Sequence, residues 1–387
     1  MDVKNIVVIG VGLMGNGIAQ VSLMAGYNVT LVDIKQDFID KAVESIKGGL
    51  TKLESKGVLK AAEIIARMKT DLDLASAVKD ADLIIEAVVE DMDVKKKIFK
   101  TCDENAPPHA IIASNTSTMS ITEMATATNR EDKCIGMHFF NPAPLMRLVE
   151  VIAGEKSSDE SMEIGVKVSE KLPCLRGDRY VAKVLKDRPG FIVNRLNAPG
   201  GIYMNYLLDT CLEKGISFEA LDADFGSRGP MSPLVLSDYT GIDTGYHVRN
   251  YYADTLHEDF RPGKVITKMF KEGKLGRKTG QGFYDWTKGR PQPDFSKVEK
   301  PGLINPGVFL AIQLNEGCRI LEEGIASGWK VIDDANMAGM NAPGPFERGV
   351  QNWEGLVKLL DEYSEKLRKE YLKPCKLFKS GKFVDMK

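Results

Sequence analysis

Residues 4–15 read KNIVVIGVGLMG and carry the strongest fold signal of this 387-residue chain. Residues 4–9 are a short apolar run rich in Val and Ile, and the glycine motif Gly10-Val11-Gly12-Leu13-Met14-Gly15 follows directly. An amphipathic stretch then continues to Ala25, and a second apolar run occupies residues 29–32. This order predicts a strand, a glycine turn, a helix and a second strand, which is the beginning of a parallel sheet.

Strands and helices continue to alternate after this first unit. Two helices broken near Gly57 are expected over residues 35–69, and a further helix is expected over residues 159–171. Further buried strands are expected at residues 83–88, 110–113, 133–139 and 147–152, the last after the turn at Pro142 and Pro144. The alternation predicts a doubly wound α/β domain of the Rossmann type over residues 1–187.

Beyond residue 187 the pattern becomes helical, beginning with residues 191–214 and a stop at Gly215. We expect an all-α C-terminal region with two tandem helical units, residues 188–298 and 299–387. The two share LEKGI at 212–216 and LEEGI at 321–325, and Gly, Met and Pro residues follow in both, as at Gly229-Pro230-Met231. A tandem duplication is our interpretation, and two unrelated helical hairpins are the alternative.

Composition excludes several classes of function. The net charge of -2 and the pI near 6.2 give no attraction for polyanions, so nucleic acid is not an expected partner. The longest apolar runs fall far short of the ~20 residues that span a bilayer, and no leader pattern precedes the first strand, so we expect a cytoplasmic protein without membrane contact. The six cysteines and four histidines lack metal-ligand spacing, which predicts reduced thiols and no metal site.

The glycine motif is typical of dinucleotide binding, because glycines let backbone N–H groups reach a pyrophosphate at a helix N-terminus. Asp33 ends the second strand, 18 residues beyond Gly15, where its carboxylate can accept the ribose hydroxyls. The same charge would repel a 2′-phosphate, which favours NAD over NADP. A structural glycine turn is the alternative. The expected cofactor contacts are Gly10, Gly12, Leu13, Met14, Gly15 and Asp33.

A second chemical signal is the pair of segments His138-Phe139-Phe140-Asn141-Pro142 and Leu148-Val149-Glu150-Val151. If these strands pair across the proline turn, Glu150 can hold one imidazole nitrogen of His138 while the other nitrogen faces a substrate. This is the arrangement of a general base with an orienting acid. A lone histidine in a buried strand is more often structural, and the flanking residues shift this balance toward catalysis.

Together these motifs resemble the L-3-hydroxyacyl-CoA dehydrogenase family, from the first strand through roughly residue 290. The resemblance implies reversible, NAD-dependent oxidation of an L-3-hydroxyacyl-CoA to the 3-ketoacyl-CoA, with a short-chain substrate such as 3-hydroxybutyryl-CoA. The matching segments occur in family order, and they are residues 10–15 with Asp33, 86–90 with Lys95, 114–117, 138–142, 148–151, 189–195 and 276–284.

The resemblance also implies roles for individual residues. His138 is expected to be the catalytic base and Glu150 its orienting partner, while Ser117 and Asn194 hydrogen-bond the 3-oxygen and the thioester region of the substrate. Lys56 is similar in position to a residue that contacts CoA, although a solvated helix lysine is an equal alternative. Further cofactor contacts near the nicotinamide ribose and the substrate cleft are expected from Glu90, Lys95, Ser117 and Asn141.

The chain departs from the family pattern in two places. Residues 175–188 form a longer, basic stretch than the usual link, which leaves the local geometry open. The second helical unit is absent from the shorter members, which resemble dimers built through one substrate and dimerisation domain, here residues 188–298. We therefore expect a homodimer, or a monomer in which one helical copy covers the other. No crotonase-like segment is present, so enoyl-CoA hydratase activity would require a separate partner.

Two other functions stay open at this point. The chain could oxidise a free 3-hydroxy acid or a sugar acid, or it could be a catalytically retired NAD-binding structural protein. Four intact residues, Ser117, His138, Glu150 and Asn194, favour an active enzyme over the retired protein.

Overall fold

A computed structural model of the chain describes residues 1–226 and 231–387, so Gly229 and Pro230 of the proposed repeat lie outside the described residues. The contacts divide the chain into two compact units. The sheet unit comprises Met1–Asn194 and Ile320–Gly344, and the helical unit comprises Arg195–Arg319 and Pro345–Lys387. This division differs from the three consecutive ranges expected from the sequence, because residues 320–344 join the sheet unit.

An eight-stranded sheet in the order β3-β2-β1-β4-β5-β6-β7-β8 forms the centre of the sheet unit. Strands β1 to β6 are parallel, β7 is antiparallel to β6, and β8 is parallel to β7. The chain reverses its direction of winding at β1 and β4, whose carboxyl ends flank the crevice where such sheets bind ligands. The strands are β1 (Asn5–Ile9), β2 (Asn28–Val32), β3 (Met68–Asp71), β4 (Leu83–Glu86), β5 (Ile111–Ser114), β6 (Cys134–Phe139), β7 (Leu148–Ala153) and β8 (Tyr180–Val184).

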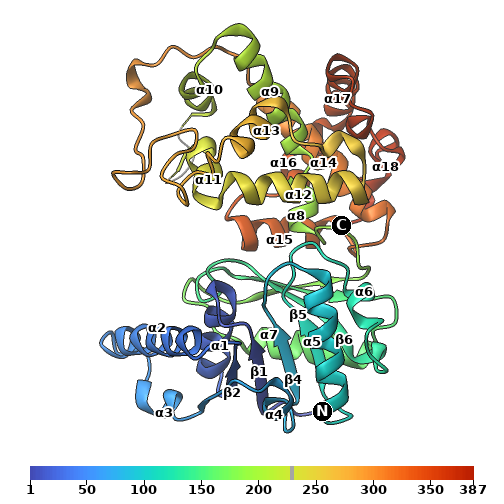
Figure 1. Cartoon of the computed structure of the whole chain (residues 1–387). Helices are drawn as coiled ribbons and strands as arrows, with labels where there is room; N and C mark the ends of the chain where they lie inside the picture. The colour runs from blue at the N-terminus through green and yellow to red at the C-terminus, as the bar shows by residue number, and fades with distance from the viewer. Residues whose placement is uncertain (227–230) are drawn as a thin grey trace. The chain divides into compact units, whose positions relative to one another are not determined.

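Helices cover both faces of this sheet, which confirms the predicted Rossmann-type class (Figure 1). Alternate residues of β1 point into different cores: Ile6 and Val8 pack under α1, α2, α3 and α7, whereas Val7 and Ile9 pack under α4, α5 and α6. The helices are α1 (Leu13–Met24), α2 (Gln36–Glu54), α3 (Ala61–Ile65), α4 (Leu74–Ala77), α5 (Met92–Asn105), α6 (Ile121–Ala125) and α7 (Asp159–Lys171).

Three features differ from the predicted elements. Strand β3 lies at the end of the range expected to be helical, and strand β8 lies within the basic stretch 175–188. Both are edge strands with mixed exposure, so neither shows the apolar run that marks a buried strand. The helix expected over residues 191–214 is divided at Pro199, which cannot donate a backbone hydrogen bond inside a helix.

The segment 320–344 packs on the edge of the sheet formed by β7 and β8. Helix α15 (Trp329–Met340) contacts both strands. The Leu185 N–H donates to the Ile325 carbonyl at 2.8 Å, and Gly339 allows the helix to approach Leu148, whose Cδ2 would stand 2.7 Å from a Cβ at that position. Part of the second helical copy is therefore a component of the sheet unit.

The two copies of the proposed repeat share one helix-ending turn. Gly215 and Gly324 both adopt left-handed backbone angles, with φ of 65° and 67°. The next residue donates its N–H five residues back in both copies, from Ile216 to Cys211 at 2.9 Å and from Ile325 to Ile320 at 3.0 Å. This is the Schellman type of helix ending, for which glycine is preferred.

Asp238 organises the helical unit around the segment that reads GRKTGQGFY at residues 276–284. Its carboxylate accepts the N–H groups of Phe283 and Tyr284 at 2.9 Å and the Trp286 indole N–H at 3.0 Å. Burial raises the pKa of Asp238 despite these donors. The helices are α8 (Val193–Asn197), α9 (Gly200–Lys214), α10 (Phe218–Phe225), α11 (Pro233–Thr240), α12 (Ile242–Thr255), α13 (Lys264–Lys271), α14 (Pro306–Glu322), α16 (Pro345–Gly349), α17 (Trp353–Leu367) and α18 (Lys376–Ser380).

We expect Gly282→Ala to lower the free energy of unfolding by about 2–4 kcal/mol, since it disturbs a buried acceptor and its donors. A Cβ at Gly282 would stand 2.1 Å from Asp238 Oδ1, so the buried carboxylate would have to leave its three donors. The control is Gly48→Ala in α2, where no atom lies within 4 Å of the new Cβ. Urea unfolding with equal midpoints for the two variants would contradict the prediction.

Candidate active site

The glycine loop between β1 and α1 leaves one position open to a ligand. A Cβ at Gly15 would stand 1.8 Å from the Gly10 carbonyl oxygen, so Gly15 is required by the packing of the loop itself. Gly10 has φ of 83° and donates its N–H to the Val32 carbonyl at 2.8 Å. At Gly12, by contrast, no atom lies within 4 Å of an added Cβ, and no side chain caps α1. A pyrophosphate can therefore approach the first N–H groups of the helix.

Asp33 ties this loop to the end of β2. Its Oδ2 accepts the Val11 N–H at 2.8 Å, and its Oδ1 accepts the Ile34 N–H at 2.7 Å. The carboxylate thus stands beside the loop, as the sequence predicts, and each oxygen retains a lone pair for a ribose hydroxyl. Leu13 is 74% exposed at the start of α1, next to this position.

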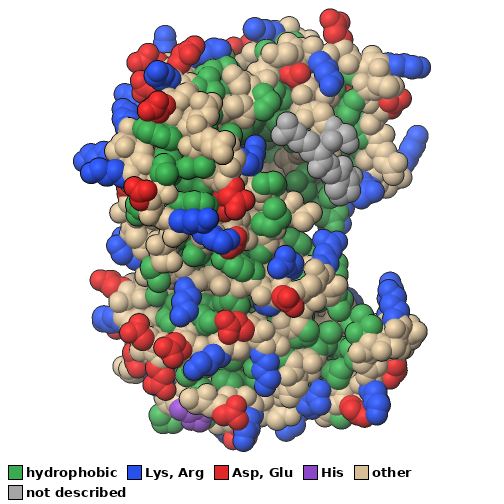
Figure 2. All heavy atoms as spheres, turned by 180° about the vertical axis from the view of Figure 1, so that it is seen from behind, with side chains coloured by type: hydrophobic (Ala, Val, Ile, Leu, Met, Phe, Trp, Pro, Cys, Tyr) green, Lys and Arg blue, Asp and Glu red, His purple; other side chains and the backbone are tan. Residues whose placement is uncertain are grey.

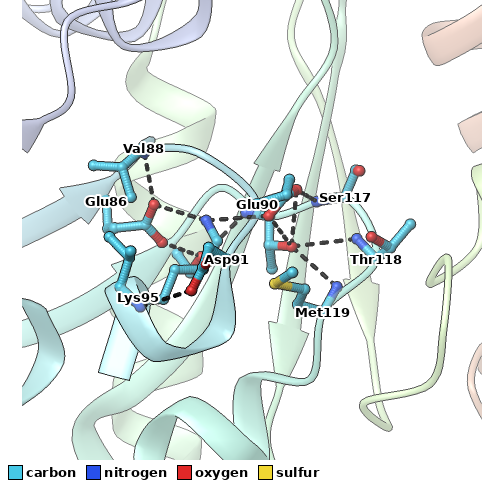
Figure 3. Close-up of polar contacts among 11 residues, drawn as sticks. Glu86, Val88, Glu90, Asp91, Lys95, Ser117, Thr118 and Met119 are labelled. Carbon is cyan, nitrogen blue, oxygen red and sulfur yellow. Dashed lines mark hydrogen bonds and ion pairs between the residues drawn. The ribbon is translucent and has the colours of Figure 1, made fainter. Parts of the chain in front are cut away.

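A buried ion pair lies at the end of β4 (Figure 3). The Lys95 ammonium is 2.8 Å from Glu86 and 3.2 Å from Glu90, and the Lys95 side chain is only 1% exposed. Glu86 also accepts the Ser114 hydroxyl at 2.6 Å and the Val88 N–H at 2.7 Å. Since Glu90 is 43% exposed, it is the member of this group that is open to a ligand.

Glu90 holds the loop that carries Ser117. Its carboxylate accepts the Thr116 hydroxyl at 3.0 Å and the Ser117 N–H at 3.0 Å (Figure 3). The half-buried Ser117 side chain makes no hydrogen bond to any of the residues that the structure describes. The charge network beginning at Glu86 therefore positions a serine whose hydroxyl is available.

His138 and Glu150 face each other across β6 and β7. The two residues are directly paired in the antiparallel register, and His138 Nδ1 is 2.7 Å from Glu150 Oε2. The imidazole is 5% exposed and packs against the rings of Phe140 and Phe191, at centroid distances of 4.6 and 5.8 Å. The strand pairing expected from the sequence is present, and Nε2 has no hydrogen-bond partner within the described part of the chain.

The other oxygen of Glu150 receives the start of α8. Oε1 accepts the Ile192 N–H at 3.1 Å and the Val193 N–H at 2.9 Å. Gly190 and Phe191 both have left-handed backbone angles, with φ of 81° and 55°, and this double turn aims the two N–H groups at the carboxylate. Asn194 follows Val193 in the chain, so its backbone position is fixed by the same carboxylate that contacts His138.

The turn after His138 lies against the helix that follows the glycine loop. A Cβ at Gly17 of α1 would stand 3.2 Å from both Ala143 Cβ and Pro144 Cδ. Asn115 also reaches this region, because its Oδ1 accepts the Phe139 N–H at 2.9 Å. The cofactor loop and the histidine strand are thus joined through direct packing within one unit.

No hydrogen bond or ion pair among the described residues joins the side chains of Asn141 and Lys56 to this network. Asn141 is exposed in the turn between β6 and β7, and Lys56 is exposed just after α2, so their contacts with cofactor and CoA stay predictions. Four residues build the site without a role predicted from the sequence, namely Glu86, Asn115, Thr116 and Phe191. An acid at the end of an apolar strand was the available signal for Glu86.

Neither a helix long and apolar enough to cross a membrane nor a group of three potential metal ligands occurs among residues 1–226 and 231–387. On the face drawn in Figure 2, basic and acidic side chains are interspersed with hydrophobic ones and do not gather into a patch of one sign.

Two family descriptions match this chain. The NAD binding domain of 3-hydroxyacyl-CoA dehydrogenase matches residues 5–174, and the C-terminal domain of the same family matches residues 190–286. A probable 3-hydroxybutyryl-CoA dehydrogenase of Deinococcus radiodurans is 40% identical over 284 residues, which is 72% of this chain and 99% of the relative. The chain belongs to the 3-hydroxyacyl-CoA dehydrogenase family. It is an NAD-dependent 3-hydroxyacyl-CoA dehydrogenase, which confirms the family, cofactor and activity predicted from the sequence.

Other members of the family differ in how much of the chain they cover. The mitochondrial hydroxyacyl-coenzyme A dehydrogenase of Sus scrofa is 39% identical over 299 residues, covering 73% of this chain and 91% of its own length. The crystal structure of 3-hydroxybutyryl-CoA dehydrogenase from Escherichia coli K12 has a TM-score of 0.86 at 26% identity, and it covers 100% of this chain and 99% of that one. The second helical region of this dehydrogenase therefore has a counterpart in a solved relative.

We expect Gly12→Ala and Gly15→Ala to separate cofactor binding from folding. Gly12→Ala should keep the melting temperature and weaken NADH binding by about tenfold or more, because its methyl group occupies the approach to α1. Gly15→Ala should unfold at lower temperature, because its Cβ collides with the Gly10 carbonyl. Thermal unfolding and NADH fluorescence titration measure the two effects. Full NADH affinity in Gly12→Ala would contradict the assignment of the loop.

Proposed function

We propose that this dehydrogenase oxidises short-chain L-3-hydroxyacyl-CoA thioesters, such as 3-hydroxybutyryl-CoA, with His138 as the general base. The observation that carries the proposal is the 2.7 Å contact between His138 Nδ1 and Glu150 Oε2. A carboxylate at Nδ1 favours the tautomer with its proton on Nδ1 and leaves the lone pair of Nε2 for a substrate proton.

The chemistry of the reaction requires such a base. Removing a hydride from C3 of the substrate requires the proton of its hydroxyl group to leave as well, so an acceptor must lie within hydrogen-bond reach of that oxygen. The bound nicotinamide supplies the hydride acceptor. His138 takes the proton at Nε2, and Glu150 stabilises the imidazolium through Nδ1, as acids beside catalytic histidines do.

Ser117 and Asn194 are proposed to hold the reacting part of the substrate. Each is half-buried, and each is held in place by an acid of the network, Ser117 by Glu90 and Asn194 through Glu150. Their hydroxyl and amide groups can donate to the 3-oxygen and to the thioester carbonyl. Because both acids also accept backbone N–H groups, the two donors are positioned before the substrate arrives.

Support for a short acyl chain comes from the relatives. The Escherichia coli structure that covers the whole chain and the Deinococcus radiodurans relative both carry the name 3-hydroxybutyryl-CoA dehydrogenase. A free 3-hydroxy acid would lack the CoA portion, for which exposed Lys56 is a proposed contact. The homodimer, the monomer and the separate hydratase partner expected from the sequence stay predictions.

Consumption of NADH with 3-ketoacyl-CoA thioesters of graded length tests the substrate. We expect kcat/KM to be highest with acetoacetyl-CoA and to fall by about tenfold or more with ten-carbon and longer chains, which a short acyl site excludes. Free acetoacetate is the control and should give no measurable turnover. A maximum at long chains, or equal turnover of free acetoacetate, would reject the proposed substrate.

The variants His138→Gln and Glu150→Gln test the base. His138→Gln should lower kcat by on the order of 10²-fold or more, within the range for a lost general base, while NADH affinity stays unchanged. Glu150→Gln should lower kcat less and leave KM for acetoacetyl-CoA nearly unchanged, because Glu150 acts by positioning His138. The control is His109→Gln, at an exposed histidine paired with Asp82 at the opposite ends of the strands. Turnover of His138→Gln near the wild-type value would remove His138 from the mechanism.

A further inference from the structure

A pocket of about 460 Å³ lies within the helical unit, between helices from both copies of the repeat. Its apolar wall includes Met204 and Leu208 of α9 in the first copy, and Phe309 and Leu310 of α14 in the second. The volume falls in the range of small-molecule sites, which are largely apolar with a few polar groups. None of the residues assigned above to the dehydrogenase site lines this pocket.

One polar group in the pocket is a guanidinium without a charged partner. Arg249 of α12 lines the pocket, and its Nε atom is buried without a hydrogen-bond partner in the described residues. Its Nη1 makes one long hydrogen bond, 3.5 Å, to the Gly245 carbonyl of its own helix. No described carboxylate pairs with it, and residues 227–230 read SRGP, which includes no acidic side chain.

Two glycines make room for this guanidinium. A Cβ at Gly201 of α9 would stand 3.2 Å from Nη2 and 3.4 Å from Nε, and a Cβ at Gly245 would stand 3.2 Å from Nη1. The Arg249 group therefore lies directly against the backbone of the first turn of α9. Burial lowers the pKa of Arg249, because the charged form of the guanidinium is disfavoured when it is kept away from water without an anion.

The surroundings of Arg249 favour a negative charge. Gly200 and Gly201 begin α9, whose N-terminus carries a partial positive charge. Exposed Arg348 lines the same pocket. Asp224 is the acid of the lining, and its Oδ2 already accepts the N–H groups of Leu303 and Ile304 at 2.8 and 3.1 Å.

We propose that this pocket binds a small amphiphilic anion, an aliphatic carboxylate whose head group pairs with Arg249 and whose chain lies along the apolar wall. A carboxylate matches the planar guanidinium with two parallel hydrogen bonds. The chain of the ligand displaces water from Met204, Leu208 and Phe309. This site is additional to the dehydrogenase site and depends on the second helical copy, since α14 forms one of its walls.

Calorimetric titration of the full-length protein with octanoate, without NAD or CoA thioester, tests the site. We expect one octanoate per chain, and we expect acetate and octanol to bind about tenfold more weakly or worse, because each lacks one half of the ligand. Hexyl phosphate and inorganic phosphate distinguish a carboxylate from a phosphate head group. Stronger binding of hexyl phosphate than of hexanoate would overturn the assignment of a carboxylate.

Variants connect the binding to the pocket. Arg249→Gln should weaken the affinity for octanoate by about tenfold or more. Met204→Trp should abolish octanoate binding, because the larger side chain fills the apolar part of the pocket. The control is Arg290→Gln, at an exposed arginine of the same unit, which should bind octanoate as the wild type does. Without octanoate, Arg249→Gln should melt at or above the wild-type temperature, because an unpaired buried cation is removed. Unchanged octanoate affinity in Arg249→Gln, or a melting temperature several degrees lower, would overturn the proposal. His138→Gln should bind octanoate normally, so the outcome is independent of the proposed catalytic base.

Discussion

The carboxylate of Glu150 is the contact on which the candidate active site depends. One oxygen is 2.7 Å from the His138 imidazole, and the other accepts two backbone N–H groups at the start of α8. A buried acid at 0% exposure needs such donors, because an unpaired charge in the interior is costly. The same need for partners brings the strand of His138 and the segment that leads to Asn194 to one place, so the pairing of the buried charge and the geometry of the candidate site have a common cause.

The acids on the cofactor side also act on the backbone. Asp33 holds the Val11 and Ile34 N–H groups, while Glu86 and Glu90 share the buried Lys95 ammonium and extend to Ser114, Thr116 and Ser117. Each carboxylate thereby stiffens a loop at the carboxyl end of a strand. Loops at this edge carry the ligand contacts in doubly wound sheets, and rigid loops lose less entropy when a ligand binds.

The repeated helical segment shows how similar sequences reach different environments. Both copies end a helix with the same glycine turn, at Gly215 and Gly324. The helix that follows belongs to the helical unit in the first copy and to the sheet unit in the second. Gly339 lets α15 approach β7 closely, and α14 of the second copy closes a pocket that includes Arg249. The local signal of a turn specifies a helix ending but not the surface on which the next helix packs.

Local pattern alone determined the Rossmann-type class, the glycine loop with Asp33 at the end of the next strand, and most strands of the sheet, and it predicted that Glu150 meets His138 if their strands pair. These features follow from short-range periodicity and from spacings that a strand or a proline turn translates directly into geometry. The tertiary structure alone decided the edge strands β3 and β8 and the division of the second helical copy between two units. It also decided the ion pairs of Glu86 and Glu90 with Lys95. The hydrogen bonds from the Ile192 and Val193 N–H groups to Glu150 likewise appear only in the folded chain. Those features depend on contacts between distant segments, and the burial and charge pairing that select them exist only once the chain has folded.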